Sequence, residues 1–338
     1  MKRTLGIIGL AAFVAVAAQA AAAQTLDAIR DRGKLICGIN PDLPGFAVRD
    51  QEGAWRGFDV DFCRAVAAAI FNDADKVEFK ALSNADRLTA LKNGDIDLLS
   101  RNTTWTMARE TGLGINFAAV TYYDGQGFLV RSNLKVESAL ELGGKSICVQ
   151  TGTTTEANLA DYFRGNKLTY QVNAFPSADE ALAAYNEGRC DAFTTDTSAL
   201  FAERLKLAKP DEHVILPDII SKEPLSPAVR QGDDRWFKVV QWTHFVMLNA
   251  EELGVTSKTI EQAMTSDNPE VRRLVGLDGS AGTEIGLTSD WAARIIRLVG
   301  NYDEVFERNF GAGSKLGIPR GINQLWTHGG IQYAPPIR

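Results

Sequence analysis

The sequence has 338 residues, with 36 basic and 42 acidic side chains and a formal net charge of −6. The two signs are mixed without long blocks of one charge, which excludes nucleic acid and anionic lipid as the main partners. A chain of this length exceeds what one hydrophobic core usually serves, so two lobes or domains are expected.

Residues 1–23 are typical of a secretory signal peptide. Lys2 and Arg3 form a positive start, residues 5–18 carry no charge, and small residues lead to Ala23, after which cleavage is predicted. The alternative is a membrane anchor, which needs about 20 strongly apolar residues, whereas this stretch is short and half alanine. No later stretch is apolar enough to span a bilayer. A soluble periplasmic protein of net charge −8, without Lys2 and Arg3, is therefore predicted.

Short apolar runs alternate with helical patterns in the first part of the chain. A loop rich in Pro and Gly over residues 40–46 follows the first strand. Strands are predicted over 34–39, 77–82 and 95–99, and helices over 58–71 and 85–92. This alternation indicates parallel strands with crossover helices, and hence the α/β class.

A second α/β series follows an extended, glycine-rich and aromatic run at residues 122–130. Its strands are predicted over 146–150, 169–174 and 191–195, its helices over 155–163 and 178–187, and a late helix over 236–253. The order suggests that the chain leaves one lobe, builds a second and returns through a two-strand hinge. The predicted parts are the signal peptide 1–23, lobe 1 from 24–128, lobe 2 from 129–226, and the return to lobe 1 with a C-terminal extension, 227–338.

Four cysteines lie in the exported part of the chain: Cys37, Cys63, Cys148 and Cys190. An even number in an oxidising compartment favours disulfides over metal binding, and four cysteines allow three pairings. The division into lobes favours Cys37–Cys63 and Cys148–Cys190, each within one lobe. The alternative is four buried free thiols.

Motifs in a fixed order resemble the amino-acid-binding family of extracellular solute-binding proteins, the periplasmic receptors of ABC importers. They are Gly57–Asp61, Arg87–Asp97, Asn102–Arg109, Gln150–Thr154 and Gly188–Asp196. Together with the tail over 321–336, they are most similar to the general L-amino-acid binding proteins. The resemblance implies a type II periplasmic-binding-protein fold, with two Rossmann-like lobes joined by a two-strand hinge. It also implies a monomer that delivers free L-amino acids to a membrane permease, without a metal or cofactor.

A receptor for free amino acids must bind one carboxylate and one ammonium. Arg109 suits the carboxylate because a guanidinium donates two parallel, charge-assisted hydrogen bonds. By the resemblance, Thr104 helps to bind the ligand backbone and Asn102 accepts from the ammonium. Alternatively, the Thr104 hydroxyl forms hydrogen bonds only within its own loop and does not bind the ligand.

The second lobe is expected to supply the other half of the site. Thr153 and Thr154 open a helix whose free N–H groups favour an anion. Asp196 ends a strand and is the expected acceptor for the ammonium, although it could instead cap a helix that begins at Ser198.

The side chain of the ligand is expected to lie among Asn40, Leu43, Asn84 and Arg87. Relatives specific for acidic amino acids have extra cations where this chain has Asn40 and Ala178, and relatives specific for basic amino acids have an aromatic ring near Leu43. With neither a cation cluster nor an aromatic box, broad selectivity is predicted.

Two other functions remain open. A secreted enzyme is disfavoured because His213, His244 and His328 have no partner at metal-ligand or triad spacing, and no G-x-S-x-G or H-E-x-x-H motif occurs. A sensory binding protein, presented to a receptor in place of an importer, would have the same ligand site.

Overall fold

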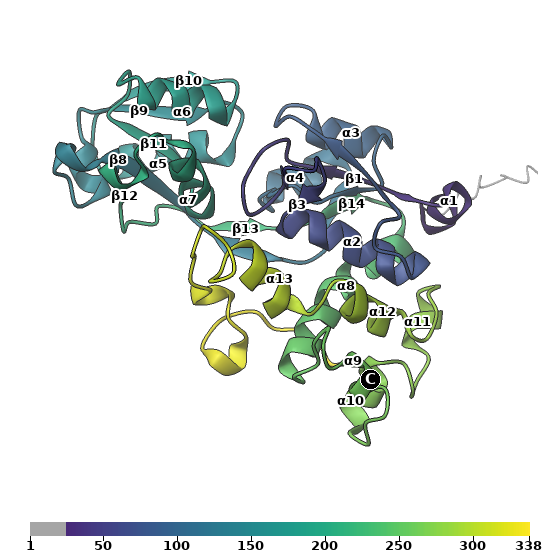
Figure 1. Cartoon of the computed structure of the whole chain (residues 1–338). Helices are drawn as coiled ribbons and strands as arrows, with labels where there is room; N and C mark the ends of the chain where they lie inside the picture. Colours follow the sequence, from purple (N-terminus) through teal and green to yellow (C-terminus); the bar gives the residue numbers. More distant parts are fainter. Residues whose placement is uncertain (1–24) are drawn as a thin grey trace, which may run out of the picture.

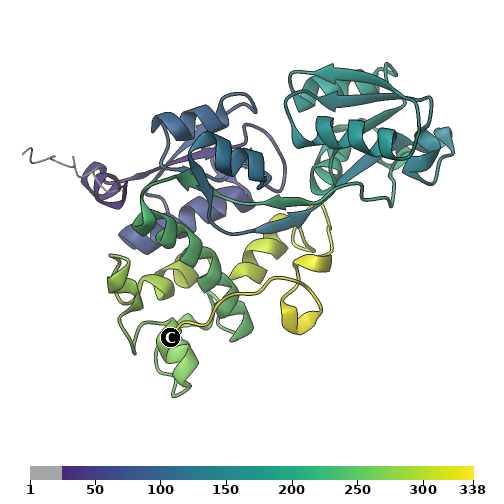
Figure 2. The same cartoon turned by 180° about the vertical axis from the view of Figure 1, so that it is seen from behind.

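The computed structural model describes residues 25–338, so the predicted signal peptide and its cleavage site after Ala23 lie outside the described residues. The described chain forms two α/β lobes, with a layer of further helices against the first lobe (Figure 1). Seen from behind, the same two lobes are joined by strands that run from one to the other (Figure 2). Between residues 25 and 338, no helix combines the length and the apolar character needed to cross a membrane.

The first lobe contains a five-stranded mixed sheet in the order β4-β1-β5-β14-β6. Strand β1 pairs in parallel with β4 and β5, whereas β14 runs antiparallel to β5 and β6. Its strands are β1 (Leu35–Ile39), β4 (Val77–Ala81), β5 (Leu98–Leu99), β6 (Ile115–Phe117) and β14 (Ala228–Arg230), and its helices are α1 (Thr25–Arg32), α2 (Phe58–Phe71), α3 (Arg87–Asn93) and α4 (Met107–Leu113). A small hairpin joins β2 (Val48–Arg49) to β3 (Trp55–Arg56).

The second lobe contains a sheet in the order β10-β9-β11-β8-β12. Strands β10, β9 and β11 are parallel neighbours, β8 pairs antiparallel with β11, and β12 pairs antiparallel with β8. Its strands are β8 (Gln126–Arg131), β9 (Ser146–Gln150), β10 (Gln171–Phe175), β11 (Ala192–Asp196) and β12 (His213–Ile215), and its helices are α5 (Thr154–Gly165), α6 (Ala178–Asn186) and α7 (Thr197–Lys206). Short 3-10 turns are η1 (Ser132–Leu134), η2 (Ala139–Leu142) and η3 (Pro210–Glu212).

Two antiparallel strands connect the lobes. They are β7 (Tyr122–Asp124) and β13 (Glu223–Leu225), and they pair Tyr123 with Pro224 at their centre. The chain enters the second sheet at the start of β8 and returns to the first sheet at β14. The fold is therefore an α/β fold with two sheets and two crossing strands, as the sequence predicts.

The chain after β14 is mostly helical and shares the core of the first lobe. Helix α8 packs against α2, α12 and α13, and its buried Trp236 donates to the carbonyl of Asp97, just before β5. The helices are α8 (Asp234–Glu252), α9 (Ile260–Ala263), α10 (Pro269–Leu274), α11 (Ala281–Glu284), α12 (Trp291–Leu298) and α13 (Tyr302–Asn309), followed by the turns η4 (Gly321–Asn323) and η5 (Trp326–His328). Among these helices, only α8 is predicted from the sequence, and helices α9 to α13 are not.

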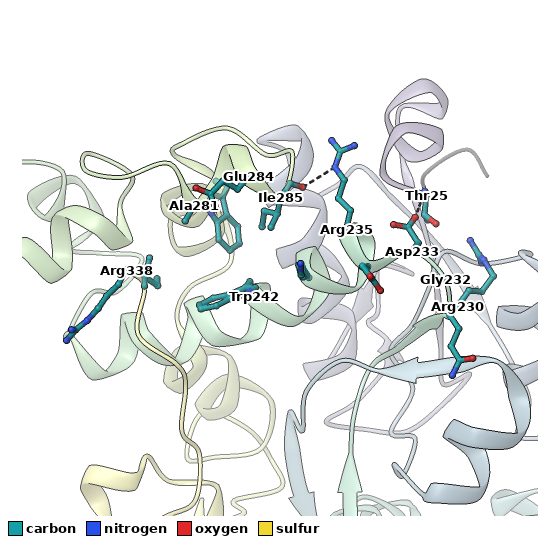
Figure 3. Close-up of a pocket in the computed structure, with 15 residues that line it drawn as sticks. Thr25, Arg230, Gly232, Asp233, Arg235, Trp242, Ala281, Glu284, Ile285 and Arg338 are labelled. Atoms are coloured by element: carbon teal, nitrogen blue, oxygen red, sulfur yellow. Dashed lines mark hydrogen bonds between the residues drawn. The ribbon is translucent and has the colours of Figure 1, made fainter. Parts of the chain in front are cut away.

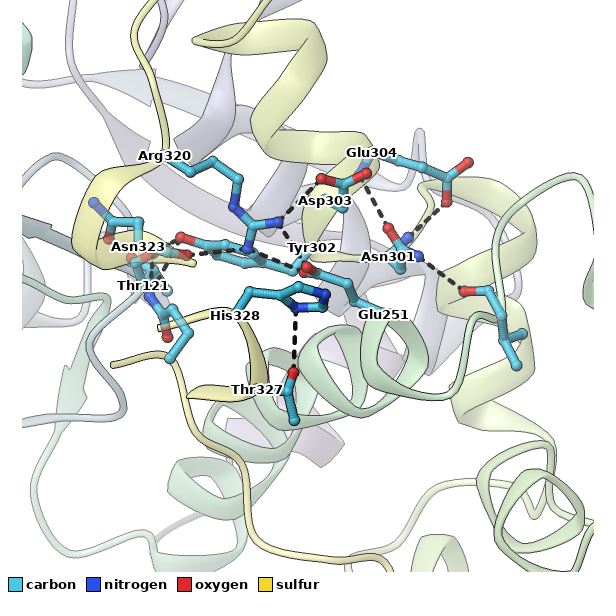
Figure 4. A network of polar contacts seen from close by, with 12 residues as sticks. Thr121, Glu251, Asn301, Tyr302, Asp303, Glu304, Arg320, Asn323, Thr327 and His328 are labelled. Carbon is cyan, nitrogen blue, oxygen red and sulfur yellow. Dashed lines mark hydrogen bonds and ion pairs between the residues drawn. The ribbon is translucent and has the colours of Figure 1, made fainter. Parts of the chain in front are cut away.

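The C-terminal segment 318–338 is anchored by a buried arginine. Arg320 donates to both carboxylate oxygens of Glu251 on α8, at 2.6 and 3.2 Å, and to Asp303 on α13, at 3.0 Å (Figure 4). Its guanidinium also lies over the ring of Tyr302. A paired and hydrogen-bonded cation of this kind satisfies the charge that burial would otherwise penalise. The segment is therefore part of the first lobe.

Both disulfides form with the predicted pairing. Cys37 of β1 bonds to Cys63 of α2, and Cys148 of β9 bonds to Cys190, just before β11. Each bond lies inside one lobe because each pair comes from a strand and a neighbouring element that covers or extends the same sheet. No free cysteine is present among the described residues.

Candidate functional site

A cavity of about 170 Å³ lies between the two lobes. Its walls are loops that follow strands of both sheets, the position at which ligand sites form in open α/β sheets. The residues of the sequence prediction that line it are Asn40, Leu43, Asn84, Arg87, Asn102, Thr104, Thr153, Thr154 and Asp196. The cavity is small beside the roughly 300–1,000 Å³ of pockets for drug-sized ligands, and suits a single small metabolite.

Arg109 is the one predicted site residue that does not line this cavity. It lies in the first turn of α4, which Thr106 caps by accepting from the Arg109 backbone N–H at 3.3 Å. The Arg109 guanidinium donates at 2.8 Å to the carbonyl oxygen of Thr104, which does line the cavity. Burial lowers the pKa of Arg109, while the charges of Glu223 and Asp196 act in the opposite direction. The cation therefore sits within the electric field of both carboxylates.

Glu223, at the start of the connecting strand β13, joins the two halves of the site. Its Oε2 accepts from the hydroxyls of Thr104 at 2.6 Å and Thr154 at 3.0 Å, one from each lobe. Its Oε1 accepts from Asn158 at 2.6 Å and Ser221 at 2.8 Å. Sequence reasoning missed Glu223 because its partners lie up to 119 positions away, and no local motif marks it.

The loop that carries Asn102 has an unusual backbone and a buried carboxylate to hold it. Asn102 has a φ of +32°, a region that few side chains other than Asn and Asp adopt. Asp59 of α2 accepts from the Asn102 backbone N–H at 2.7 Å and from Ser100 at 3.0 Å, and burial raises the pKa of Asp59 to about 6. The side chain of Asn40 donates to Asn102 Oδ1 at 3.0 Å, so both polar residues are fixed by the first lobe.

At the second-lobe wall, Thr153 is occupied as a helix cap. Its hydroxyl accepts from the backbone N–H of Glu156 at 3.2 Å and donates to the carbonyl of Gln150 at 2.7 Å. The other N–H groups in the first turn of the 12-residue helix α5 have no partner within the helix, and this helix end borders the cavity. This end of a helix favours negative charge.

Asp196 directly precedes α7, but its side chain makes no capping hydrogen bond. Although it is only 7% exposed, no group among residues 25–338 donates a hydrogen bond to its carboxylate. Burial, with the nearby carboxylates of Asp124 and Glu223, raises the pKa of Asp196 well above its usual value, against the attraction of Arg87 and Arg109. The buried carboxylate of Asp196 therefore lacks a hydrogen-bond donor within residues 25–338.

Two buried arginines, Arg87 and Arg101, share the first-lobe wall. Arg87 donates to the hydroxyl of Thr103 at 3.2 Å, and Arg101 donates through Nε to the carbonyl of Leu82 at 2.9 Å. Arg101 was not among the residues predicted from the sequence. It directly precedes the Asn102–Arg109 motif, and nothing in its local pattern separates it from a surface arginine.

The lobes touch at two places beside the cavity. Asn84 donates to the carbonyl of Gly152 at 3.1 Å. Lys206 of α7 lies 3.3 Å from the carboxylate of Asp42 and donates to its carbonyl at 3.2 Å. The cavity is therefore bounded by contacts between the lobes.

A larger cavity of about 940 Å³ lies away from this interface, beside α8, α11 and the chain end (Figure 3). Trp242, Glu284 and Arg338 are among its lining residues. None of the predicted site residues and no residue of the second sheet contributes to it, so hinge closure cannot enclose a ligand there. Within residues 25–338, no group of three or more His, Cys, Asp or Glu side chains could hold a metal ion.

Residues 35–272 match the family described as bacterial extracellular solute-binding proteins, family 3. The chain is 57% identical over 330 residues to the General L-amino acid-binding periplasmic protein AapJ of Rhizobium johnstonii, and the match covers 97% of both chains. It is 50% identical over 339 residues to the Glutamate/glutamine/aspartate/asparagine-binding protein BztA of Rhodobacter capsulatus, with full coverage of both.

A solved structure shares nearly the whole fold. It is an ABC transporter/periplasmic binding protein from Brucella ovis with glutathione bound, with a TM-score of 0.92 and 55% identity. The match covers 93% of this chain and 99% of that chain. The C-terminal helices and tail described above therefore belong to an architecture that a relative shares.

Proposed function

The chain belongs to family 3 of the bacterial extracellular solute-binding proteins, and we propose that it is the periplasmic substrate-binding component of an amino-acid ABC transporter. It binds free L-amino acids with broad specificity and delivers them to a membrane permease. Two relatives that match 97% and 100% of the chain, AapJ and BztA, carry names that describe amino-acid binding. The predicted signal peptide over residues 1–23 provides the route to the periplasm.

The observation that carries this proposal is the buried carboxylate of Asp196, which lacks a donor in a cavity between two lobes. The ammonium of a free amino acid would supply that donor. The α-carboxylate is assigned to Arg109, whose guanidinium donates to the carbonyl of Thr104, a residue of the cavity wall, and to the N-terminus of α5. A ligand with both charges on one carbon thus satisfies groups of both lobes at once.

The remaining predicted residues take supporting roles in the proposal. Thr104 and Thr154 face the ligand with hydroxyls that Glu223 orients. Asn102 offers its Oδ1, which can accept a second hydrogen bond beside that from Asn40. Asn40, Leu43, Asn84 and Arg87 surround the side chain of the ligand.

Transport follows from closure of the lobes. A ligand that contacts both lobes binds the closed form better than the open one, and so shifts the equilibrium toward it. The permease then recognises the closed form of a monomeric receptor, and the ligand leaves unchanged. A sensory receptor would use the same site, and reconstitution with the permease separates the two: ligand-dependent ATP hydrolysis supports transport.

Glutathione is the alternative ligand to be tested, because the Brucella ovis relative has glutathione bound. Its γ-glutamyl residue has a free α-ammonium and α-carboxylate, the same pair of charges. The cavity of about 170 Å³ leaves little room for the two further residues of the tripeptide. We therefore assign the free amino acid as the ligand and include glutathione in the test.

The test is calorimetric titration with the twenty L-amino acids and glutathione. Several amino acids should bind, and Asp196→Asn should weaken all of them by at least about tenfold, because the ammonium loses a buried charge partner. Arg109→Met should do the same, whereas Asp211→Asn, at an exposed position of the second lobe, should change none. Binding of glutathione alone, or of no amino acid, contradicts the proposal. NMR spectra of the ligand after incubation should show no turnover.

A further inference from the structure

One buried carboxylate, that of Glu223, accepts hydrogen bonds from both lobes at once. Glu223 is 1% exposed, and each of its carboxylate oxygens accepts from two side chains. Two of the four donors, Thr154 at 3.0 Å and Asn158 at 2.6 Å, lie on α5 of the second lobe. A carboxylate offers about four acceptor positions, so the second lobe supplies half of the donors that Glu223 can use.

The strand that carries Glu223 is fixed to the first lobe. Two backbone hydrogen bonds, of 2.8 and 3.0 Å, join residues 103–105 of the first lobe to residues 224–226. A hinge motion that separates the lobes therefore leaves Glu223 with the first lobe. The same motion breaks its hydrogen bonds to Thr154 and Asn158, because α5 moves with the second lobe.

Asn158 contributes to this contact from outside the ligand cavity. Thr104 and Thr154 line the cavity, whereas Asn158 does not. Its side-chain amide donates to Glu223 from the second turn of α5. Any effect of Asn158 on ligand binding is therefore indirect, and alanine at this position suits the helix.

The contact with Glu223 is stronger than the other two contacts between the lobes. Asn84 and Gly152 form a hydrogen bond between neutral groups at an exposed place. The ion pair of Lys206 with Asp42 involves an exposed carboxylate, so water competes with it. Hydrogen bonds to a buried charged group contribute more than either kind of contact.

We propose that Glu223 and Asn158 form a latch that stabilises the closed form with or without a ligand, and so sets the affinity for all amino acids alike. The inference rests on the proposed function, since it assumes closure around a free amino acid. Both are positioning residues, because neither contacts the ligand in the proposed binding mode. A shift of the open–closed equilibrium changes the affinity by the same factor for every ligand that binds the closed form.

Small-angle scattering of the ligand-free mature chain, with calorimetric titration of the twenty L-amino acids, tests the latch. Asn158→Ala should enlarge the ligand-free radius of gyration, and saturation with ligand should restore it. Every amino acid that binds should weaken by one common factor of up to about tenfold, the effect of a hydrogen bond to a charged group. Asp161→Ala, at a 67% exposed position of the same helix, is the matched control and should change neither quantity.

An exchange of the acid and the amide separates the latch from a merely structural role. Asn158→Asp alone places two carboxylates against each other, and should open the ligand-free protein further than Asn158→Ala does. Combined with Glu223→Gln, it again sets an amide donor opposite a carboxylate acceptor. The double variant should therefore return the radius toward the wild-type value, although each single substitution enlarges it.

Three results would overturn the latch. They are an unchanged ligand-free radius in Asn158→Ala, a changed ranking of the amino acids in that variant, and a double variant as open as Asn158→Asp alone. Where the variants with Glu223→Gln do not fold, Asn158→Ala decides by itself. Failure of every amino acid to bind the wild type refutes the proposed function instead, and the scattering of the ligand-free variants still tests the latch.

Discussion

At the scale of single residues, two carboxylates hold the site residues in place, and neither contacts the ligand in the proposed binding mode. Asp59 fixes the backbone of Asn102, and Glu223 orients the hydroxyls of Thr104 and Thr154. A carboxylate that accepts several hydrogen bonds fixes its donors strongly, because hydrogen bonds to charged groups are stronger than neutral ones. Binding groups are thus pre-oriented before a ligand arrives.

Glu203 predicts a measurable pH dependence of stability. Burial raises the pKa of Glu203 from 4.5 to about 7, so the folded chain holds a proton that the unfolded chain releases in this range. The stabilising contribution of this proton is complete below pH 4.5 and is lost as pH rises through 7. The full loss is on the order of 3 kcal/mol at 1.36 kcal/mol per pKa unit.

Glu203→Gln should therefore flatten the decline of the unfolding free energy between pH 4.5 and 7. Urea unfolding of the ligand-free protein at several pH values measures it. Glu212→Gln, at an exposed glutamate of the same lobe, should keep the wild-type curve. If the unfolding free energies of Glu203→Gln and the wild type depend on pH in the same way, Lys206 fully offsets the cost of burying the Glu203 carboxylate.

At the scale of elements, the connecting strand β7 is completed by a side chain from the C-terminal segment. Pro224 lies opposite Tyr123 in the strand pair and has no N–H to donate. In its place Asn323 donates to the carbonyl of Tyr123 at 2.9 Å, and it also accepts from the Tyr123 N–H at 2.7 Å. Arg320, which donates to the carbonyl of Asn323 at 3.0 Å, ties this contact to the anchor of Figure 4.

Asn323→Ala should loosen the connection between the lobes without changing the cavity. The backbone of Tyr123 would lose both partners, at a cost of about 1–3 kcal/mol for a buried unsatisfied group. Hydrogen exchange at the Tyr123 amide should become faster. Gln324→Ala, which removes the neighbouring amide side chain, is the matched control and should leave this exchange unchanged. Unaltered exchange in Asn323→Ala would mean that β7 does not depend on the C-terminal segment.

At the scale of the whole molecule, closure brings together groups that neither lobe holds alone. The contact of Lys206 with Asp42 spans the lobes, as does the contact of Asn84 with Gly152. Lys206 also lies 3.1 Å from Asp179 in its own lobe. Lys206 therefore neutralises a carboxylate of each lobe, Asp42 in the first and Asp179 in the second.

Lys206→Met should shift the ligand-free protein toward the open form. A partly exposed ion pair contributes about 0–1 kcal/mol, so the closed population and the affinity should each fall by no more than about fivefold. Small-angle scattering should report a larger radius of gyration for the variant. Lys209→Met removes a lysine that pairs with Glu212 inside the second lobe, and should leave the radius unchanged. The idea fails if both variants behave as the wild type does.

The sequence by itself determined what depends on neighbouring residues. Helix α2 has the predicted limits, 58–71, and β9 the predicted 146–150, because apolar periodicity and turn residues act within a few positions. The loops that follow strands were expected to meet at one edge, and the cavity is lined by most of the residues they carry. Strand β5 is shorter than predicted, with Leu98–Leu99 in place of 95–99.

Tertiary structure alone decided the partners that hold these parts together. Glu223 meets Thr104 across 119 positions, and Asn323 meets Tyr123 across 200. Arg101 becomes part of the cavity wall only because the folded loop buries it beside Arg87. Local patterns specify where a strand ends, but long-range hydrogen bonds and shared burial depend on which surfaces meet. Those surfaces exist only after both sheets have formed and the chain has crossed between them twice.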